Sequence, residues 1–233
     1  MAACVVAAGL LLTACGEATR PGDVTDPTPS ASSASPSPTA ETTTSAPDPP
    51  NLADFPLSLG YPDTNGYDGS PVEVTATSGV DDLLFCDELG WSPTREVRPV
   101  DLIGTTYTGE AEDSRGRTLA RYPEAYAARE ALSHLRSTVE ACPEDMEGGT
   151  GRVYTVTERD AGFLVTLRYR GEYGFDTGLT LIDVARVGDL LLISSEYGEG
   201  GGTDEIIRLN VRDVSAQTDE LVVAMHTMTA RPG

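Results

Sequence analysis

Few residues of this 233-residue chain are of the types that carry motif-coded catalysis. All 16 cationic side chains are Arg, and a chain without Lys lacks the lysine of a P-loop, a protein kinase, an S-x-x-K acyl-enzyme or a Schiff base. Only two histidines are present. His134 falls on the polar face of an expected helix, and His226 is ambiguous between core edge and surface. Because there is also no G-x-S-x-G elbow, the sequence predicts no enzyme, no metal site and no cofactor.

Carboxylates are the abundant chemical group, with 37 Asp plus Glu in the chain. Pairs such as Asp81 with Asp82, or Glu110 with Asp113, could serve as the acid and base of a glycosidase. An envelope hydrolase that uses surface carboxylates therefore stays open as an alternative. Solvated acidic turns explain the same pairs, because so many acids guarantee neighbours by chance.

An aromatic and cationic cluster at the end of one expected strand is the candidate ligand-binding site. Tyr169, Arg170, Tyr173 and Phe175 could line a groove on an otherwise acidic body. Tyrosines at strand ends also serve packing alone, so both interpretations of these four residues stay open.

Cys15 closes a segment with the features of a bacterial lipoprotein signal peptide, which would occupy residues 1–14. The eight residues from Val5 to Leu12 suit a secretory apolar region and are too few for the roughly 20 that span a bilayer. Leu12-Thr13-Ala14-Cys15 resembles a lipobox, because an ordinary signal peptidase needs a small residue in place of Leu12. The resemblance implies lipidation of Cys15, with acyl chains such as palmitate holding the protein on the extracytoplasmic face of the cell membrane. An apolar start with an accidental cysteine is the alternative, since no Lys or Arg precedes the run.

The other cysteines divide according to this location. Cys4 leaves with the signal peptide, so Cys86 and Cys142 remain in an oxidising compartment, where we expect them to form a disulfide. Their bridge would close a loop of 57 residues, which the chain-entropy model credits with about 4 kcal/mol. Two separate buried thiols are the alternative.

The charge of the chain limits the kinds of partner that it can bind. The formal net charge is −21, and residues 51–233 hold 32 Asp plus Glu against 15 Arg, a difference of −17. Nucleic acid is an unsuitable partner, because binding phosphate backbones requires a basic surface. Anionic lipid headgroups also repel such a protein, so membrane attachment would depend on the acyl chains.

Composition divides the mature chain into a tether and one domain. From Pro21 to Pro50, twenty of thirty residues are Pro, Ser or Thr, so residues 15–50 are predicted to be a disordered tether that carries the lipid on its first residue. Residues 51–233 are enough for a single domain with its own core.

Periodicity within that domain predicts strands and helices in mixed order. A helix is expected at 123–142, where apolar residues recur at spacings of three and four, and a second at 215–229. Alternating or apolar runs predict strands. The expected strands cover 72–77, 103–109, 118–122, 152–157, 163–170, 179–187, 190–195 and 206–211. This order predicts an α+β fold, an antiparallel meander with two main helices packed on one face.

One known domain shares these landmarks. The stretch from Arg121 through an Ala-rich helix to Cys142-Pro143, then Val184 to Gly188 before a Leu-rich strand and a closing helix, resembles the extracellular sensor domain of an actinobacterial membrane Ser/Thr kinase. Tethered lipoproteins of that phylum carry the same domain. Family members often have two disulfides, whereas only one pair is available here. The resemblance implies sensing or binding of a ligand rather than catalysis.

Together these features predict a membrane-anchored, extracytoplasmic lipoprotein with a non-catalytic ligand-binding or sensing domain. Its expected partners are the membrane, through the lipid anchor, and a small molecule or envelope component. The hydrolase and a purely structural envelope module are the alternatives.

Overall fold

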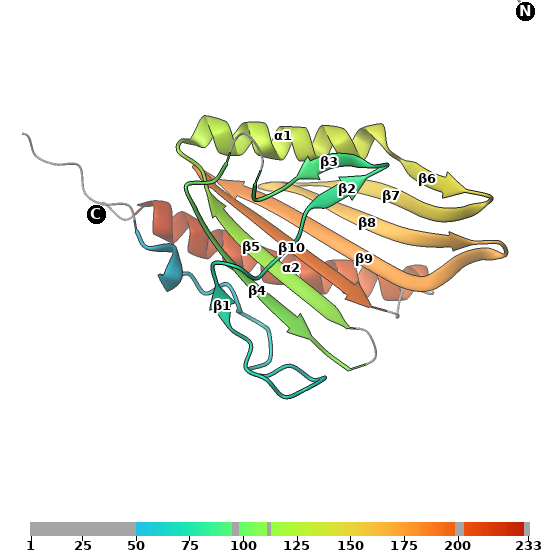
Figure 1. Ribbon diagram of the computed structural model, residues 1–233, viewed down its shortest axis with the longest axis horizontal. Coiled ribbons are helices and arrows are strands. Elements are labelled where there is room, and N and C mark those ends of the chain that lie inside the picture. The colour runs from blue at the N-terminus through green and yellow to red at the C-terminus, as the bar shows by residue number, and fades with distance from the viewer. Residues whose placement is uncertain (1–49, 95–97, 111–112, 199–202, 231–233) are drawn as a thin grey trace, which may run out of the picture. The chain divides into compact units, whose positions relative to one another are not determined.

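The fold combines an antiparallel β-sheet with two α-helices, which confirms the predicted α+β class (Figure 1). The computed structural model describes residues 50–94, 98–110, 113–198 and 203–230, so Cys15 and nearly all of the tether lie outside the described residues. The elements are η1 (Leu52–Asp54), β1 (Val74–Thr75), β2 (Leu83–Phe85), β3 (Glu88–Trp91), β4 (Asp101–Thr108), β5 (Ser114–Arg121), α1 (Ala125–Ala141), β6 (Glu144–Glu147), β7 (Thr150–Arg159), β8 (Gly162–Gly171), β9 (Gly174–Val187), β10 (Leu190–Gly198) and α2 (Asp204–Ala230).

The strands of the main sheet follow the order β1-β4-β5-β10-β9-β8-β7-β6. β6 to β10 form a continuous meander, and the β4–β5 hairpin joins it because β5 pairs with β10. α1 carries the chain from β5 to β6, at the far edge of the meander (Figure 1). Two-residue turns close two hairpins of the meander: Asp160 and Ala161 link β7 to β8, and Gly188, with a φ of +59°, and Asp189 link β9 to β10.

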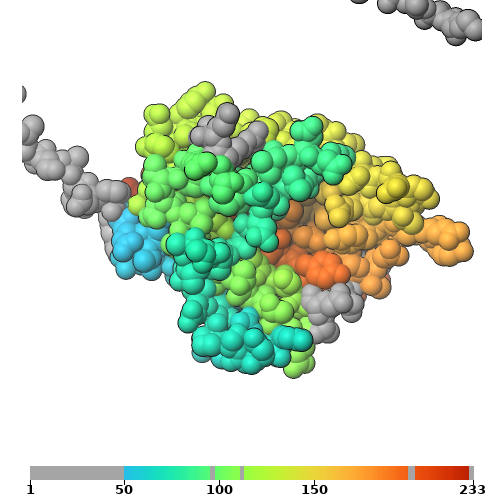
Figure 2. Space-filling model, viewed as in Figure 1, coloured from blue at the N-terminus to red at the C-terminus, as the bar shows by residue number. Residues whose placement is uncertain are grey.

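The two helices cover opposite faces of the sheet, so the prediction that both pack on one face is wrong. Leu191 and Ile193 of β10 belong to the core cluster under α1, whereas Leu190 and Leu192 pack in the cluster that contains Leu221 of α2. Neighbouring side chains of a strand point to opposite faces, so an unbroken apolar run needs cover on both. Figure 1 draws α2 behind the sheet, and Figure 2, from the same side, shows almost none of it.

The predicted disulfide is present and ties α1 to the β2–β3 hairpin. Cys86 and Cys142 are bonded, with their Cα atoms 5.9 Å apart. Cys86 and Asp87 form the two-residue turn of the hairpin and both have positive φ, the geometry of a tight hairpin turn. Cys142 directly follows the last turn of α1 and is buried. The bond therefore fixes the hairpin beside the C-terminal end of the helix.

This hairpin also changes the surroundings of His134, which the sequence placed on a solvated face. The ring nitrogen Nε2 lies 2.9 Å from the carbonyl oxygen of Leu89 in β3, and His134 is half-buried. No strand was predicted at 83–91, so nothing in the helical pattern of α1 indicated that this side of the helix would be covered.

The C-terminal helix is longer than predicted. The strand expected at 206–211 is wrong, because these residues belong to α2, which begins at Asp204. Ile207 and Val211 pack with Val214 against the sheet, at spacings of four and three that fit a helix. Among the helices in the described residues, none has both the length and the apolar composition needed to cross a membrane.

A buried ion pair joins the sheet to the middle of α2. Asp183 of β9 is 0% exposed and accepts a hydrogen bond from Arg159 at 2.7 Å. Arg159 also donates to the Ser215 carbonyl oxygen at 3.1 Å and contacts Asp219. Burial raises the pKa of Asp183 to about 7, and the opposing effects of Arg159 and of a hydrogen bond from Thr218 offset only part of that rise. The folded protein therefore binds a proton at Asp183 more tightly than the unfolded chain does.

We predict that Asp183 makes the protein less stable as the pH rises. Its pKa is higher in the folded state, so the stability it contributes is complete below about pH 4 and is lost as the pH rises through about 7. The loss amounts to at most about 4 kcal/mol, from about 1.4 kcal/mol per pKa unit. Urea unfolding of the wild type and of Asp183→Asn between pH 4 and 8 should show a shallower pH dependence in the variant. Asp219→Asn, which alters an exposed partner of Arg159, is the control, and equal slopes for Asp183→Asn and wild type would contradict the prediction.

Candidate ligand-binding site

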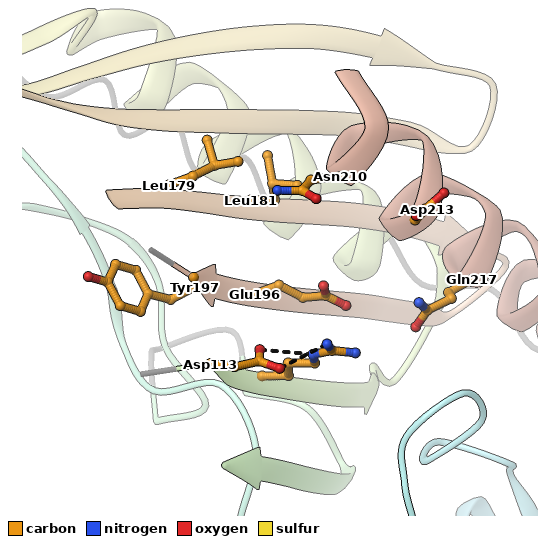
Figure 3. Close-up of a pocket in the computed structure, with 10 residues that line it drawn as sticks. Asp113, Leu179, Leu181, Glu196, Tyr197, Asn210, Asp213 and Gln217 are labelled. Carbon is orange, nitrogen blue, oxygen red and sulfur yellow. Dashed lines mark hydrogen bonds and ion pairs between the residues drawn. The ribbon is translucent and has the colours of Figure 1, made fainter. Parts of the chain in front are cut away.

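A polar pocket of about 330 Å³ lies on the α2 side of the sheet. Its walls come from the facing surfaces of β5, β10 and β9 and from one side of α2 (Figure 3). The lining residues are Asp113, Arg115, Leu179, Leu181, Glu196, Tyr197, Gly198, Asn210, Asp213 and Gln217.

Strand register brings the charged residues of the sheet together. Arg115 and Arg117 are two residues apart on β5, so their side chains share a face. Glu196 and Ser194 of β10 pair directly with them across the ladder. This register places a carboxylate beside two guanidinium groups without any sequence motif.

One side of α2 closes the pocket over these strands. Asn210, Asp213 and Gln217 recur at spacings of three and four and therefore lie on one face of the helix. Figure 3 shows the Gln217 side chain directed toward the part of the pocket that holds the carboxylate of Glu196. The helix thus supplies two amides and a carboxylate.

Arg115 is held by a forked ion pair. Its Nε and Nη2 atoms donate to the two carboxylate oxygens of Asp113 at 3.1 and 2.9 Å. The guanidinium also lies 5.4 Å from the ring centroid of Tyr107 on β4. Bidentate pairing fixes the geometry of the Arg115 side chain and balances its charge within the protein.

Arg117 forms the buried back of the site. It is 1% exposed, and its guanidinium lies 4.1 Å from the ring centroid of Tyr61. Burial lowers the pKa of the Arg117 guanidinium, an effect that nearby Tyr61 and Glu196 oppose. Its hydrogen-bond acceptors are Ser194 Oγ at 3.4 Å, the Leu57 carbonyl oxygen at 3.1 Å, the Leu59 carbonyl oxygen and Gln217 Oε1.

Glu196 lines the pocket and has a buried carboxylate oxygen without a hydrogen-bond partner in the described part of the chain. Its Oε1 atom is closed off from solvent and has no hydrogen-bond partner among the described residues. Burial raises the pKa of the Glu196 carboxyl, and the attraction of Arg115 and Arg117 offsets part of that rise. A buried acceptor without a partner costs about 1–3 kcal/mol. An uncompensated carboxylate inside a pocket is typical of a site that binds a ligand or transfers a proton.

The four predicted ligand-binding residues do not form one groove. Phe175 lies between two arginines, with its ring centroid 3.7 Å from Arg168 and 5.3 Å from Arg170. Tyr173 is 95% exposed in the β8–β9 turn, and Tyr169 packs with the core cluster on the α1 side. None of the four lines the pocket. Their role in ligand binding stays a prediction.

The carboxylate pairs singled out in the sequence do not form the pocket. Asp81, Asp82 and Glu110 are exposed. Asp113 does line the pocket, but its partner is Arg115 rather than Glu110.

Sequence reasoning missed Glu196, although a signal was present. Glu196 lies in the same strand as the apolar run 190–193, two residues after Ser194 and four after Leu192, at a position that points inward. Asn210 was missed because its segment was assigned to a strand.

Comparisons with known proteins give a fold-level likeness. No protein-family model matches the chain, and no curated protein matches it. Among solved structures, the chain is similar to the extracellular domain of PknH from Mycobacterium tuberculosis, with a TM-score of 0.40 and 11% sequence identity. The likeness covers 67% of this chain and 81% of that chain. It is a weak resemblance of fold, and it leaves the family of this chain undetermined.

We predict that Arg117 is required for the stability of the domain. In Arg117→Met the side-chain volume is nearly kept, but the carbonyl oxygens of Leu57 and Leu59 and the Gln217 amide oxygen lose their donor. We expect the free energy of unfolding to fall by about 2–4 kcal/mol, measured by urea denaturation. Arg212→Met, which alters an exposed arginine of α2, should change stability by less than about 0.5 kcal/mol. A variant at position 117 as stable as the wild type would contradict the assigned role.

Proposed function

We propose that this chain is a lipid-anchored protein of the extracytoplasmic membrane face whose folded domain binds a small ligand in the pocket between β5, β10, β9 and α2. The lipobox-like sequence ending at Cys15 supports the anchor, and the acidic tethered domain supports a location away from the membrane surface. The single observation that carries the binding site is Glu196, whose buried Oε1 atom lacks a partner at the wall of an open pocket.

The geometry favours binding over a structural role for this pocket. A core that served stability alone would fill the space or pair the carboxylate, because each unsatisfied buried group lowers stability. Here Arg115 and Arg117 are both fixed by other partners, and the opening of about 330 Å³ remains. A ligand with a donor or a positive charge beside the Glu196 carboxylate would compensate part of the cost of burying it.

A hydrolase at the same pocket is the second candidate. The raised pKa of Glu196 is the observation that favours it, since a general acid must hold its proton near neutral pH. Against this role, Asp113, a neighbouring carboxylate, is already engaged by Arg115 and is therefore a poor base or nucleophile. We accordingly propose that the domain is non-catalytic.

Filling the pocket should abolish binding. Thermal shifts of the intact protein against a library of cationic, neutral and anionic small molecules should identify ligands that raise the unfolding temperature by a few degrees. Asn210→Trp, which places an indole at the mouth of the pocket, should remove those shifts, whereas Arg208→Trp on an exposed position of α2 should keep them. The site is refuted when no compound gives a shift or when the shift survives in Asn210→Trp. Product release from a glycan or ester library that stops in Glu196→Gln would instead favour the hydrolase.

The anchor has its own test. Cys15→Ser should shift the protein from the membrane fraction to the soluble fraction and remove the mass of the diacylglyceryl group. Cys4→Ser, a change within the signal peptide, should leave the anchored protein unaltered. Detergent partitioning that persists in Cys15→Ser would show that attachment has another cause.

A further inference from the structure

We infer that the ligand of this pocket is a compact organic cation, a molecule with an ammonium or guanidinium group on a small body. This inference rests on the proposed function and adds the chemical class of the ligand.

The cationic groups at the pocket are already used by the protein. Arg115 lines the pocket, but both oxygens of Asp113 bind it in a forked ion pair. Arg117 lies behind the wall and donates to Leu57, Leu59, Gln217 and Ser194. An anionic ligand could reach only the remaining N–H groups of Arg115, whose charge Asp113 already balances, and it would meet the carboxylates of Glu196 and Asp213 as it entered.

The acceptor groups, by contrast, have unused capacity. Glu196 has a carboxylate oxygen without a hydrogen-bond partner in the described residues, and burial raises the pKa of its carboxyl. Asp213 is exposed and lines the pocket, and its carboxylate lies 3.2 Å from the guanidinium of its neighbour Arg212. A ligand that brings positive charge and N–H donors would satisfy both carboxylates. A neutral ligand could donate a hydrogen bond, but it would leave the three carboxylates Asp113, Glu196 and Asp213 in excess over the two guanidinium groups of Arg115 and Arg117.

The remaining lining fits an organic body better than a bare metal ion. Leu179 and Leu181 give one apolar wall, and the amides of Asn210 and Gln217 are neutral. Among the described residues, no three His, Cys, Asp or Glu side chains are grouped so that they could hold a metal ion. The net charge of −21 adds a long-range field that favours the approach of cations.

The test uses a four-carbon series that differs in charge at nearly constant length. Isothermal titration of the folded protein with putrescine, 4-aminobutan-1-ol, 1,4-butanediol and succinate separates charge from shape, and agmatine supplies the guanidinium case. We expect at least one of the three cations to bind and 1,4-butanediol to bind at least about 10-fold more weakly, with no binding of succinate.

Variants then assign the preference to Glu196. Glu196→Gln keeps the shape of the side chain and should weaken cation binding at least about 10-fold, with no comparable loss for a neutral compound. Glu220→Gln, an exposed acid elsewhere on α2, removes the same charge from the protein and should change the affinity less than about 2-fold. Unfolding temperatures of both variants verify that the fold is intact.

The outcomes separate this inference from the proposed function. Pocket ligands from the library that are lost in Asn210→Trp but are neutral or anionic would overturn the cation class and leave the binding site standing. Cation affinity that is unchanged in Glu196→Gln would likewise overturn this inference alone. An absence of any ligand, in the library and in the four-carbon series, would overturn both.

Discussion

The buried guanidinium of Arg117 is the constraint on which the α2 side of the protein depends. A charge that is 1% exposed must be solvated by the protein itself, and its partners come from three separate places: the segment before β1, which supplies two carbonyl oxygens and the ring of Tyr61, then β10 and α2. These contacts fix the height of α2 above the sheet near Gln217. The pocket is the space beside this contact, toward Glu196 and Asn210. We infer that the contacts of Arg117 set the separation between α2 and the sheet and so keep the pocket open.

Polar groups run as a band under α2 and divide its packing into two apolar parts. Leu221 and Met225 pack in one cluster and Val214 in another, while Gln217 and Thr218 lie between them at the positions of Arg117 and Asp183. Under α1, a large apolar cluster packs against the sheet, and the disulfide holds the helix end. The α2 side instead carries charged and polar groups between its apolar clusters, and the pocket lies on this side.

The sequence specified the fold class and the local elements better than the assembly. The meander from 150 to 198, helix α1 and the disulfide of Cys86 with Cys142 could be predicted, because turn residues, apolar periodicity and cysteine arithmetic are local signals. The side of each helix could not be predicted from β8, because Leu164 shares its face of the strand with Thr166 and Arg168, a pattern that suggests a wet face, although Leu164 is buried under α2. The site depends on strand register between β5 and β10, whose paired residues are 69 or more positions apart in sequence, and no sequence signal marks that pairing.

The carboxylate of Glu196 links the charge of the proposed ligand to pH. Arg115 and Arg117 already attract the Glu196 carboxylate, and each is held in place by hydrogen bonds to other groups. A proton and a cationic ligand are then two alternative ways to compensate one buried charge, with Asp113, Asp213 and Tyr61 as its other titratable neighbours. A bound cation favours the ionised form and lowers the pKa of Glu196, and a bound proton weakens the cation site by the same free energy. This coupling between the proton and the cation requires that the groups around Glu196 stay in place. The contacts that hold Arg117 would therefore let Glu196 alone set the charge preference of the pocket.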